Sequence, residues 1–340
     1  MDDLQPPSRK KILIIRFSSI GDIVLTTPII RCLKKQFPDH LIHFLIKKEY
    51  KNVLEENPYI DKFHVFNGNL AETISELKEE QFDYIADLQH NYRSKRVISS
   101  LKIPSRSFPK LNVKKWVATN IKLNFLPNTH IVDRYFEAVK PLGVINDEQG
   151  LDFFIPEEQK FDIDDLPAVF EDGYVTIALG AQHETKRIPQ QKVIEIAKLL
   201  YDPILLLGGD DVAAIGDEIV MELGERAYNG CKKFTLMQSA SLIQQSNCLL
   251  TGDTGLMHIA AALHKPIASI WGNTFPEFGM YPYMPNERGN FRLFEITPLC
   301  CRPCSKLGYK KCPKKHFKCM LNIPAPEVAQ WINLFCDDSI

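Results

Sequence analysis

The sequence predicts an α/β protein built from two domains, and three observations support this prediction. A length of 340 residues favours two domains over one. Short apolar runs alternate with helical segments in both halves of the chain, which indicates parallel β–α–β units. An acid-rich stretch, residues 146–173, separates the halves and holds ten acidic residues against one lysine. We therefore expect two Rossmann-like domains that face each other across a cleft.

The first half alternates strand and helix from its start. Pro28 stands at the first position of a helix, where its missing N–H removes no hydrogen bond. The acid-rich stretch predicts the interdomain linker, at about residues 156–172. The expected strands are residues 11–16, 41–46 and 84–87, and the expected helices are residues 27–36, 70–80 and 131–139.

The second half alternates more clearly. A glycine-rich turn, residues 208–211, joins a strand to a helix that ends at Leu223. The further strands are expected at 174–179, 204–207, from 248 and at 266–270, and the helices at 189–200, 235–245, from 255 and at 326–335. The resulting domains are residues 1–155 and 174–324, followed by a C-terminal helix within residues 325–340.

Composition excludes several classes of protein. Hydrophobic residues make up 45% and charged residues 24%, as in ordinary soluble globular proteins. A net charge of -1 argues against a general nucleic-acid binder. No run approaches the roughly 18 to 20 apolar residues of a membrane span. Residues 1–10 are polar and lack the apolar core of a signal peptide, so we expect a cytoplasmic protein.

The segment from Asp253 to His258 is the most informative part of the chain. It follows an apolar strand beginning at Cys248 and precedes a helix of small residues, so its polar groups stand at the carboxyl end of a strand. Ligands of open α/β sheets bind at that end, and the free N–H groups of the following helix favour an anion. The turn Trp271 to Thr274 repeats this arrangement and predicts a cleft. We therefore expect a phosphate-bearing ligand near Thr254 and Gly255; His258, considered alone, is more often a packed or capping residue.

Two other turns carry candidate chemistry. Ser18, Ser19 and Gly21 form a serine-rich glycine turn of the kind that holds phosphate, although it matches neither standard nucleotide loop. Asp22 is either a helix cap near Thr26 or a general base. In the turn after the strand at 174–179, Lys186 and Arg187 are either two surface cations or the cations that close over a diphosphate.

Five of the nine cysteines lie in one short segment, residues 300–319. Such a cluster in a cytosolic protein favours metal binding or redox activity over a disulfide framework. Four of them suit a structural, tetrahedral zinc site, with His316 as an alternative ligand, namely Cys301, Cys304, Cys312 and Cys319. The spacing differs from a standard zinc ribbon, and reduced cysteines packed in a loop are the other interpretation.

A basic segment runs from Asn91 to Phe125, with nine Lys or Arg residues and no acid. It is either a solvated surface or a docking face for something anionic. Trp116, beside Lys114 and Lys115, favours the docking face.

Taken together, these motifs resemble glycosyltransferase family 9, the lipopolysaccharide heptosyltransferase family. The resemblance extends from about Lys11 to Ile323 and rests on three segments: Ser18 to Asp22, Lys186 before Ile188-Pro189, and Asp253-Thr254-Gly255 with His258. The cysteine-rich segment is similar to the cysteine-rich loop of the second-heptose type of enzyme.

The resemblance implies a GT-B fold in which the N-terminal domain binds the acceptor and the C-terminal domain binds the nucleotide-sugar. It implies an ADP-L-glycero-D-manno-heptose donor, a lipopolysaccharide core acceptor, inversion at the anomeric carbon and no metal required for the chemistry. It assigns Asp22 as the base and Lys186 to the diphosphate. Thr254 and Gly255 hold phosphate oxygens, while Asp253 and His258 line the donor.

Three alternatives remain open. Ile188 stands where the family commonly has tryptophan, so the chain can be a family member that uses another nucleotide-sugar on a different glycan. A non-catalytic GT-B scaffold would bind the sugar-nucleotide without turnover, although Asp22 and Lys186 together argue against it. A sugar-nucleotide epimerase of the same fold would act on the donor without an acceptor.

Overall fold

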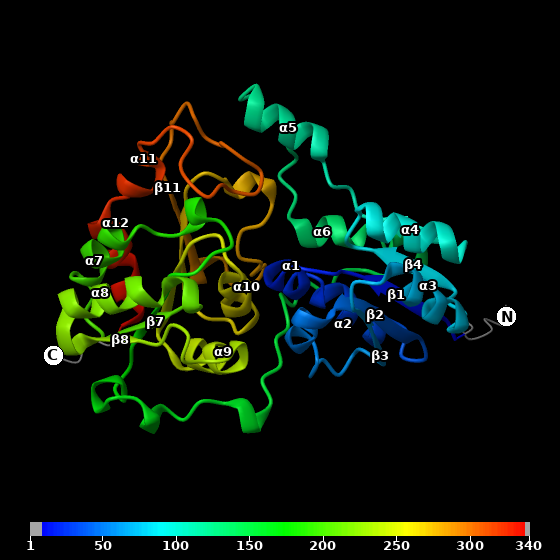
Figure 1. Ribbon diagram of the computed structural model, residues 1–340, viewed down its shortest axis with the longest axis horizontal. Coiled ribbons are helices and arrows are strands. Elements are labelled where there is room, and N and C mark those ends of the chain that lie inside the picture. The colour runs from blue at the N-terminus through cyan, green and yellow to red at the C-terminus, as the bar shows by residue number, and fades with distance from the viewer. Residues whose placement is uncertain (1–8, 337–340) are drawn as a thin grey trace. The chain divides into compact units, whose positions relative to one another are not determined.

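The computed structural model describes residues 9–336, and within it the chain forms two compact units (Figure 1). The first unit comprises the chain up to Lys110 together with Ile131–Phe154. The second unit comprises Leu111–His130 and the chain from Ile155 onward. The chain therefore leaves the first unit, contributes 20 residues to the second, and returns.

The first unit contains a five-stranded sheet in the order β3-β2-β1-β4-β5, with every pair parallel. Helices α3 and α4 cover one face through an apolar cluster that includes Ile74, Leu77 and Val97. The strands are β1 (Lys11–Ile15), β2 (Leu41–Lys47), β3 (Lys62–Phe66), β4 (Tyr84–Asp87) and β5 (Ser105–Ser107). The helices are α1 (Ile20–Val24), α2 (Thr27–Gln36), α3 (Leu70–Glu79), α4 (Tyr92–Leu101) and α6 (Ile131–Phe136).

The second unit contains a six-stranded parallel sheet in the order β11-β10-β9-β6-β7-β8. Helices α7, α8 and α12 cover one face, and α9 and α10 pack together on the other (Figure 1). The strands are β6 (Val175–Ala178), β7 (Ile204–Leu207), β8 (Ala227–Asn229), β9 (Cys248–Thr251), β10 (Ile267–Trp271) and β11 (Phe291–Glu295). The helices are α5 (Asn112–Asn120), α7 (Gln190–Ala197), α8 (Ala213–Leu223), α9 (Leu236–Gln245), α10 (Gly255–Ala262), α11 (Lys318–Leu321) and α12 (Ala325–Ile332).

The central strands are continuous apolar runs because helices bury both of their faces. Ile12 to Ile15 in β1 and Ile204 to Leu207 in β7 are essentially inaccessible to solvent. The α/β class with two parallel-sheet units, predicted from these runs, is confirmed. The short or polar strands β3, β5, β8 and β11 were not predicted; β5 reads Ser-Arg-Ser and carries no apolar signal.

Three segments differ from what the sequence predicts. The sequence places residues 111–130 in the N-terminal domain, whereas the structure packs them in the second unit. The expected linker contains three short 3₁₀ turns but also packs on the second unit, where Phe161 contacts Phe234 and its N–H donates to the Ser241 hydroxyl. The expected C-terminal helix forms only over Ala325–Ile332, and residues 1–8 and 337–340 lie outside the described residues.

Candidate active site

In the first unit, the polar turn after β1 lies beside the turn after β4. The chain extends the sheet from β1 to one side through β2 and β3, and then to the other side through β4 and β5. This order makes the carboxyl ends of β1 and β4 a topological switch point, where ligands of open α/β sheets bind. Arg16 Nη1 donates to the Leu88 carbonyl at 2.6 Å and the Phe17 N–H donates to Gln89 Oε1 at 2.8 Å, which joins the two turns.

Asp22 lies in this turn as the third residue of α1. The N–H and hydroxyl of Ser19, the N-cap residue, donate to Asp22 Oδ2 at 3.3 and 2.9 Å. Asp22 therefore caps α1, which was not predicted, rather than the helix that begins at Thr27. Its Oδ1 lies 2.7 Å from Arg16 Nη2, and 26% of its side chain stays exposed. The carboxylate is oriented by two neighbours but remains accessible to a substrate.

Arg16 is the residue that the sequence reasoning missed in this unit. Its buried guanidinium also contacts the Ser18 carbonyl and the Tyr135 hydroxyl. Burial lowers the pKa of Arg16, but Asp22, Tyr135 and Asp87 together more than offset this, so the net pKa is raised. An arginine at the end of an otherwise apolar strand was the available signal, because a buried charge needs a partner.

In the second unit, the switch point lies between β6 and β9. The chain continues from β6 to β7 and β8 on one side, and then adds β9, β10 and β11 on the other. The turns that follow these two strands are in direct contact, because Lys186 Nζ lies 2.6 Å from Asp253 Oδ2. Gly252 permits this contact, since a Cβ there would lie 2.2 Å from the Lys186 carbonyl oxygen. The sequence therefore placed Lys186 and Asp253 at the correct sheet edge but missed Gly252.

Thr254 is the N-cap residue of α10, and Gly255 is the first residue of that helix. The Thr254 hydroxyl accepts from the Met257 N–H at 3.4 Å and lies 2.9 Å from the Thr251 hydroxyl. The first backbone N–H groups of a helix have no partner within the helix, and the helix dipole favours negative charge there. Together with the Lys186 ammonium, this geometry suits a phosphate group, which must share the lysine with Asp253.

The turn after β10 joins the same group of loops. The Thr274 hydroxyl donates to Asp253 Oδ2 at 3.1 Å, so the predicted proximity of these two strand ends is confirmed. Arg302 fixes this turn by donating to the carbonyls of Gly272 and Thr274 at 2.6 and 3.0 Å. Arg302 lies within the cysteine-rich segment, and no role for it was predicted from the sequence.

The cysteine-rich segment also supports the turn that carries Lys186. The Tyr309 N–H donates to the Thr185 hydroxyl at 2.8 Å, and the Thr185 N–H donates to the Tyr309 carbonyl at 3.2 Å. Gly308 packs so closely on His183 that a Cβ would lie 2.5 Å from the histidine Cβ. Because this segment also supplies Arg302, it contacts the turns after both β6 and β10.

The remaining candidates have different environments. Arg187 donates to the Ala181 carbonyl and pairs with Asp211, so it holds its own turn in place. His258 lies in α10 and is only 2% exposed. Ser18, Ser19 and Gly21 lie in the first unit, as does the candidate base Asp22, whereas Asp253, Thr254, Gly255 and His258 lie in the second. The seven candidate donor residues are therefore divided between the units.

The thiols of the cysteine cluster are neighbours but do not form a closed site. Cys301 Sγ lies 3.8 Å from His316 Nε2, and the Cys304 thiol contacts the Cys301 carbonyl. Burial, followed by the neighbouring Cys301, raises the pKa of Cys304 to about 11, and burial raises that of Cys319 to about 12. Within residues 9–336, a different group of side chains could hold a metal ion, because its potential ligand atoms all lie within 4.8 Å of one another.

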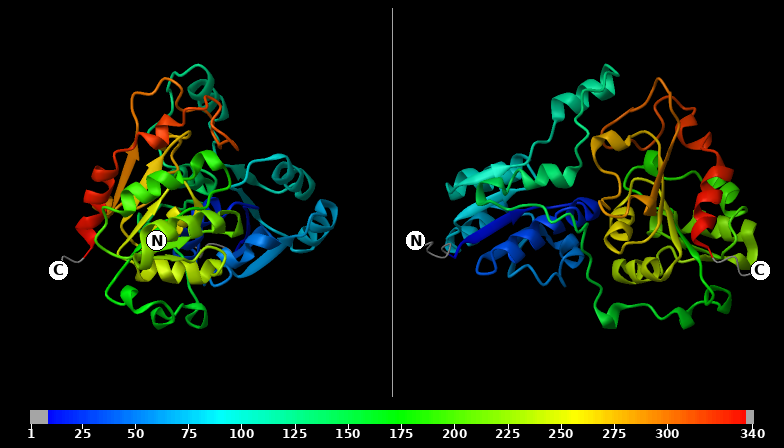
Figure 2. Two further views of the ribbon diagram at one scale, coloured as in Figure 1. Left: turned by 60° about the vertical axis from the view of Figure 1, so that its left-hand side comes forward. Right: turned by 180° about the vertical axis from the view of Figure 1, so that it is seen from behind.

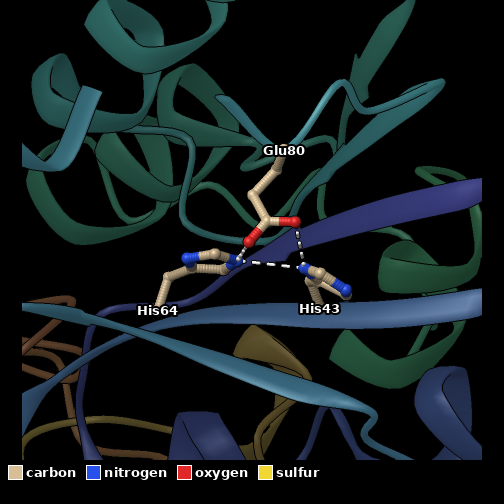
Figure 3. Close-up of side chains that lie close together, drawn as sticks. All are labelled: His43, His64 and Glu80. Carbon is tan, nitrogen blue, oxygen red and sulfur yellow. Dashed lines mark hydrogen bonds and ion pairs between the residues drawn. The ribbon is translucent and has the colours of Figure 1, made fainter. Parts of the chain in front are cut away.

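That group consists of His43 on β2, His64 on β3 and Glu80 after α3 (Figure 3). His43 Nδ1 lies 3.0 Å from His64 Nε2, and the carboxylate lies 3.8 and 4.0 Å from the two rings. However, Glu80 already pairs with Lys11 and Lys62. A divalent cation would enter a largely buried group that already carries a net positive charge, so we interpret it as a hydrogen-bonding network.

This network predicts a loss of stability in acid. Burial, followed by His43, lowers the pKa of His64 to about 4, whereas an unfolded histidine binds a proton near 6.5. Between these values the unfolded chain binds more protons, so the free energy of unfolding falls as pH drops from about 6.5 to 4, by up to about 3 kcal/mol. The hydrogen bond from Lys62 lowers the pKa of Glu80 to about 2, which adds a further loss below about pH 4.5.

His64→Gln should flatten the dependence between pH 6.5 and 4, because it removes the buried ring. Urea unfolding of the variant and of wild type, measured across this range, tests the prediction. An unaltered pH slope in folded His64→Gln protein would exclude His64 as its source.

The two parallel-sheet units, each with a switch-point site, are typical of the GT-B fold of glycosyltransferases. The solved structure described as E. coli ADP-heptose lps heptosyltransferase II matches with a TM-score of 0.72 at 21% identity. The match covers 96% of this chain and 98% of that one, so the likeness extends through both units.

The chain belongs to glycosyltransferase family 9, the heptosyltransferases, whose family model matches residues 71–309. Lipopolysaccharide heptosyltransferase 1 of Campylobacter coli is 25% identical over 291 residues, which are 78% of this chain and 84% of the relative. Lipopolysaccharide heptosyltransferase 2 of Escherichia coli K12 is 24% identical over 293 residues, which are 79% and 84% of the two chains. The expected family is therefore confirmed.

Proposed function

We propose that this glycosyltransferase transfers a heptose from ADP-L-glycero-D-manno-heptose to a lipopolysaccharide core acceptor with inversion. The observation that carries the proposal is the Lys186–Asp253 contact beside the N-terminus of α10, at the switch point of the second unit. A diphosphate requires such a combination of a fixed cation and helix N–H groups. The names of the relatives support heptose as the sugar, and that of the solved neighbour supports ADP-heptose as the donor.

In the proposed reaction, Asp22 accepts the proton of the acceptor hydroxyl as its oxygen attacks the anomeric carbon. The bond from that carbon to the diphosphate oxygen breaks, and ADP leaves with the electron pair. Lys186, the Thr254 hydroxyl and the N–H groups near Gly255 stabilise the charge that develops on the diphosphate. Attack opposite the leaving group inverts the anomeric configuration. Ser18, Ser19, Gly21, Asp253 and His258 are proposed donor contacts.

The ion pair with Arg16 suits Asp22 to this role. Arg16 stabilises the carboxylate form, which is the form that can accept a proton. The Ser19 contacts hold Asp22 Oδ2, and the exposed part of the side chain leaves room for a hydroxyl. A carboxylate that served only as a helix cap would not need the buried guanidinium of Arg16 as a further partner.

A donor screen tests the proposed function. Among ADP-, GDP-, UDP- and CMP-sugars, ADP-heptose should raise the melting temperature most, because a ligand that binds the folded state stabilises it. Incubation with a lipopolysaccharide core acceptor should then yield the heptosylated product and ADP. Binding without product would support the non-catalytic scaffold, and conversion of the donor without acceptor would support the epimerase.

We also propose a structural zinc ion, outside the chemistry, held by Cys301, Cys304, Cys312 and Cys319. The contact of the Cys304 thiol with the Cys301 backbone supports it, and His316, whose Nε2 lies 3.8 Å from Cys301 Sγ, is close enough to replace one of the thiols. Zinc would hold the segment that contacts the turns of Lys186 and Thr274. It supplies no step of the reaction.

The zinc proposal predicts about one equivalent of metal in protein purified without chelator. Elemental analysis measures it, and Cys304→Ser should lower the content and weaken ADP binding through the Tyr309–Thr185 contact. Cys32→Ser, at a buried cysteine of the first unit, is the control. Less than about a tenth of an equivalent in well-folded protein would refute the zinc site.

We propose that the protein works in the cytoplasm, in peripheral contact with the inner face of the cytoplasmic membrane. Within residues 9–336, no helix combines the length and the apolar character needed to cross a bilayer. A lipopolysaccharide core acceptor is an anionic glycolipid, so the enzyme has to reach it at a membrane surface.

A further inference from the structure

Residues 111–126, which we call the 111–126 segment, expose an unusual set of large apolar side chains. In α5, Val113 is 77% and Trp116 is 57% exposed, and after the helix Ile121 and Leu123 are each 52% and Phe125 is 62% exposed. Val113 and Trp116 are three residues apart and so share one side of the helix. Single exposed apolar residues are ordinary, whereas here five of them fall within 13 positions.

The opposite side of the segment is anchored to the second unit. Ala118 and Leu126 pack against Phe275 and Phe278. Lys122 Nζ donates to the carbonyls of Cys301 and Pro303 at 3.2 and 2.6 Å. Figure 2 shows α5, in teal, beside the orange loops of the second unit. The exposed apolar side chains therefore belong to a segment that is held in place by contacts with the second unit.

The charged residues of the segment itself all have one sign, while Glu277 and Glu295 of the second unit line a pocket with Ala118, Lys122 and Asn124. Lys114 is exposed within α5, and no acidic residue occurs from Asn91 to Phe125. The structure divides the basic segment expected from the sequence between the two units, after Lys110. The part in the second unit therefore combines apolar and basic side chains without any acid.

We infer that the 111–126 segment inserts its apolar side chains into the interfacial region of an anionic lipid bilayer. Tryptophan and phenylalanine favour the boundary between headgroups and acyl chains, and lysines beside them bind anionic headgroups. A partner protein would more often present mixed charges at the rim of such a surface. The choice of a bilayer rests in part on the proposed lipid-linked acceptor.

Trp116 allows a direct test, because the other two tryptophans, Trp271 and Trp331, are buried. Vesicles of phosphatidylcholine and phosphatidylglycerol should shift the emission of wild-type protein to the blue, and brominated lipids should quench it. Trp116→Phe should remove the shift while most of the protein still sediments with the vesicles. Pure phosphatidylcholine vesicles should bind less protein, and salt should weaken binding only in part.

The variant Val113→Ser/Leu123→Ser/Phe125→Ser keeps Trp116 and should lower the vesicle partition coefficient at least tenfold. Its melting temperature should stay near that of wild type, because all three side chains are exposed. The matched control Met221→Ser/Leu334→Ser changes exposed apolar residues elsewhere in the second unit and should bind like wild type.

Absence of bromolipid quenching in wild-type protein that sediments with vesicles would overturn the inference, whichever variants fold. Unchanged vesicle partitioning of the triple variant would also overturn it. The same holds if wild-type protein self-associates and the triple variant loses this self-association but still binds lipid. The vesicle assay contains neither donor nor acceptor. Its failure is therefore distinguishable from a failure of the proposed transfer reaction.

Discussion

Replacing Asp22 with asparagine should lower kcat about 100- to 10,000-fold while leaving donor affinity nearly unchanged. The amide retains the size of the side chain but cannot accept the proton of the acceptor hydroxyl. Donor affinity should persist because the proposed diphosphate contacts, at Lys186 and Thr254, belong to the second unit. Steady-state kinetics with saturating donor and calorimetric titration with ADP measure the two quantities separately.

Two controls separate catalysis from folding. Asp22→Asn leaves the buried Arg16 guanidinium without its carboxylate partner, so its melting temperature must be compared with that of wild type. Ser19→Ala removes a contact to Asp22 Oδ2 and a proposed donor contact but keeps the carboxylate, so at saturating donor it should lower kcat far less than Asp22→Asn. Near-wild-type turnover in folded Asp22→Asn protein would exclude Asp22 as the base.

Lys186→Ala and Thr254→Ala should each weaken ADP binding, and the effect should be larger for Lys186. Hydrogen bonds to charged groups contribute on the order of 1.5 to 3 kcal/mol, which corresponds to roughly 10- to 150-fold in affinity. Removing Lys186 also leaves Asp253 without its cation, so the carboxylate would repel the diphosphate. Calorimetric titration with ADP gives both affinities.

The controls for this prediction use the same unit. Thr254→Ser keeps the hydroxyl that caps α10 and should retain most of the affinity, which separates loss of the hydroxyl from change of the side chain. Lys198→Ala removes an exposed lysine that pairs with Glu222 and should have no effect. If ADP affinity is unchanged in both Lys186→Ala and Thr254→Ala, the diphosphate does not bind at this switch point.

The sequence by itself determined the features that depend on neighbouring residues. Strands and helices follow from the local spacing of apolar residues, so β1, α2, β7 and α10 are close to their predicted bounds. Caps and turns are equally local, which is why Thr254 could be placed at a helix start. The same local reasoning identified Asp22 as a capping residue but assigned it to the wrong helix.

Only the tertiary structure decided which of these local features meet. The contact of Lys186 with Asp253 depends on the strand order that places β6 beside β9, and on the absence of a Cβ at Gly252. The orientation of Asp22 depends on Arg16, whose other partners, Leu88 and Tyr135, are 72 and 119 residues away in the chain. The 111–126 segment packs on the second unit through Phe275 and Phe278, far along the sequence. Such contacts leave no periodic pattern, because they arise from packing between elements that only the folded chain brings together.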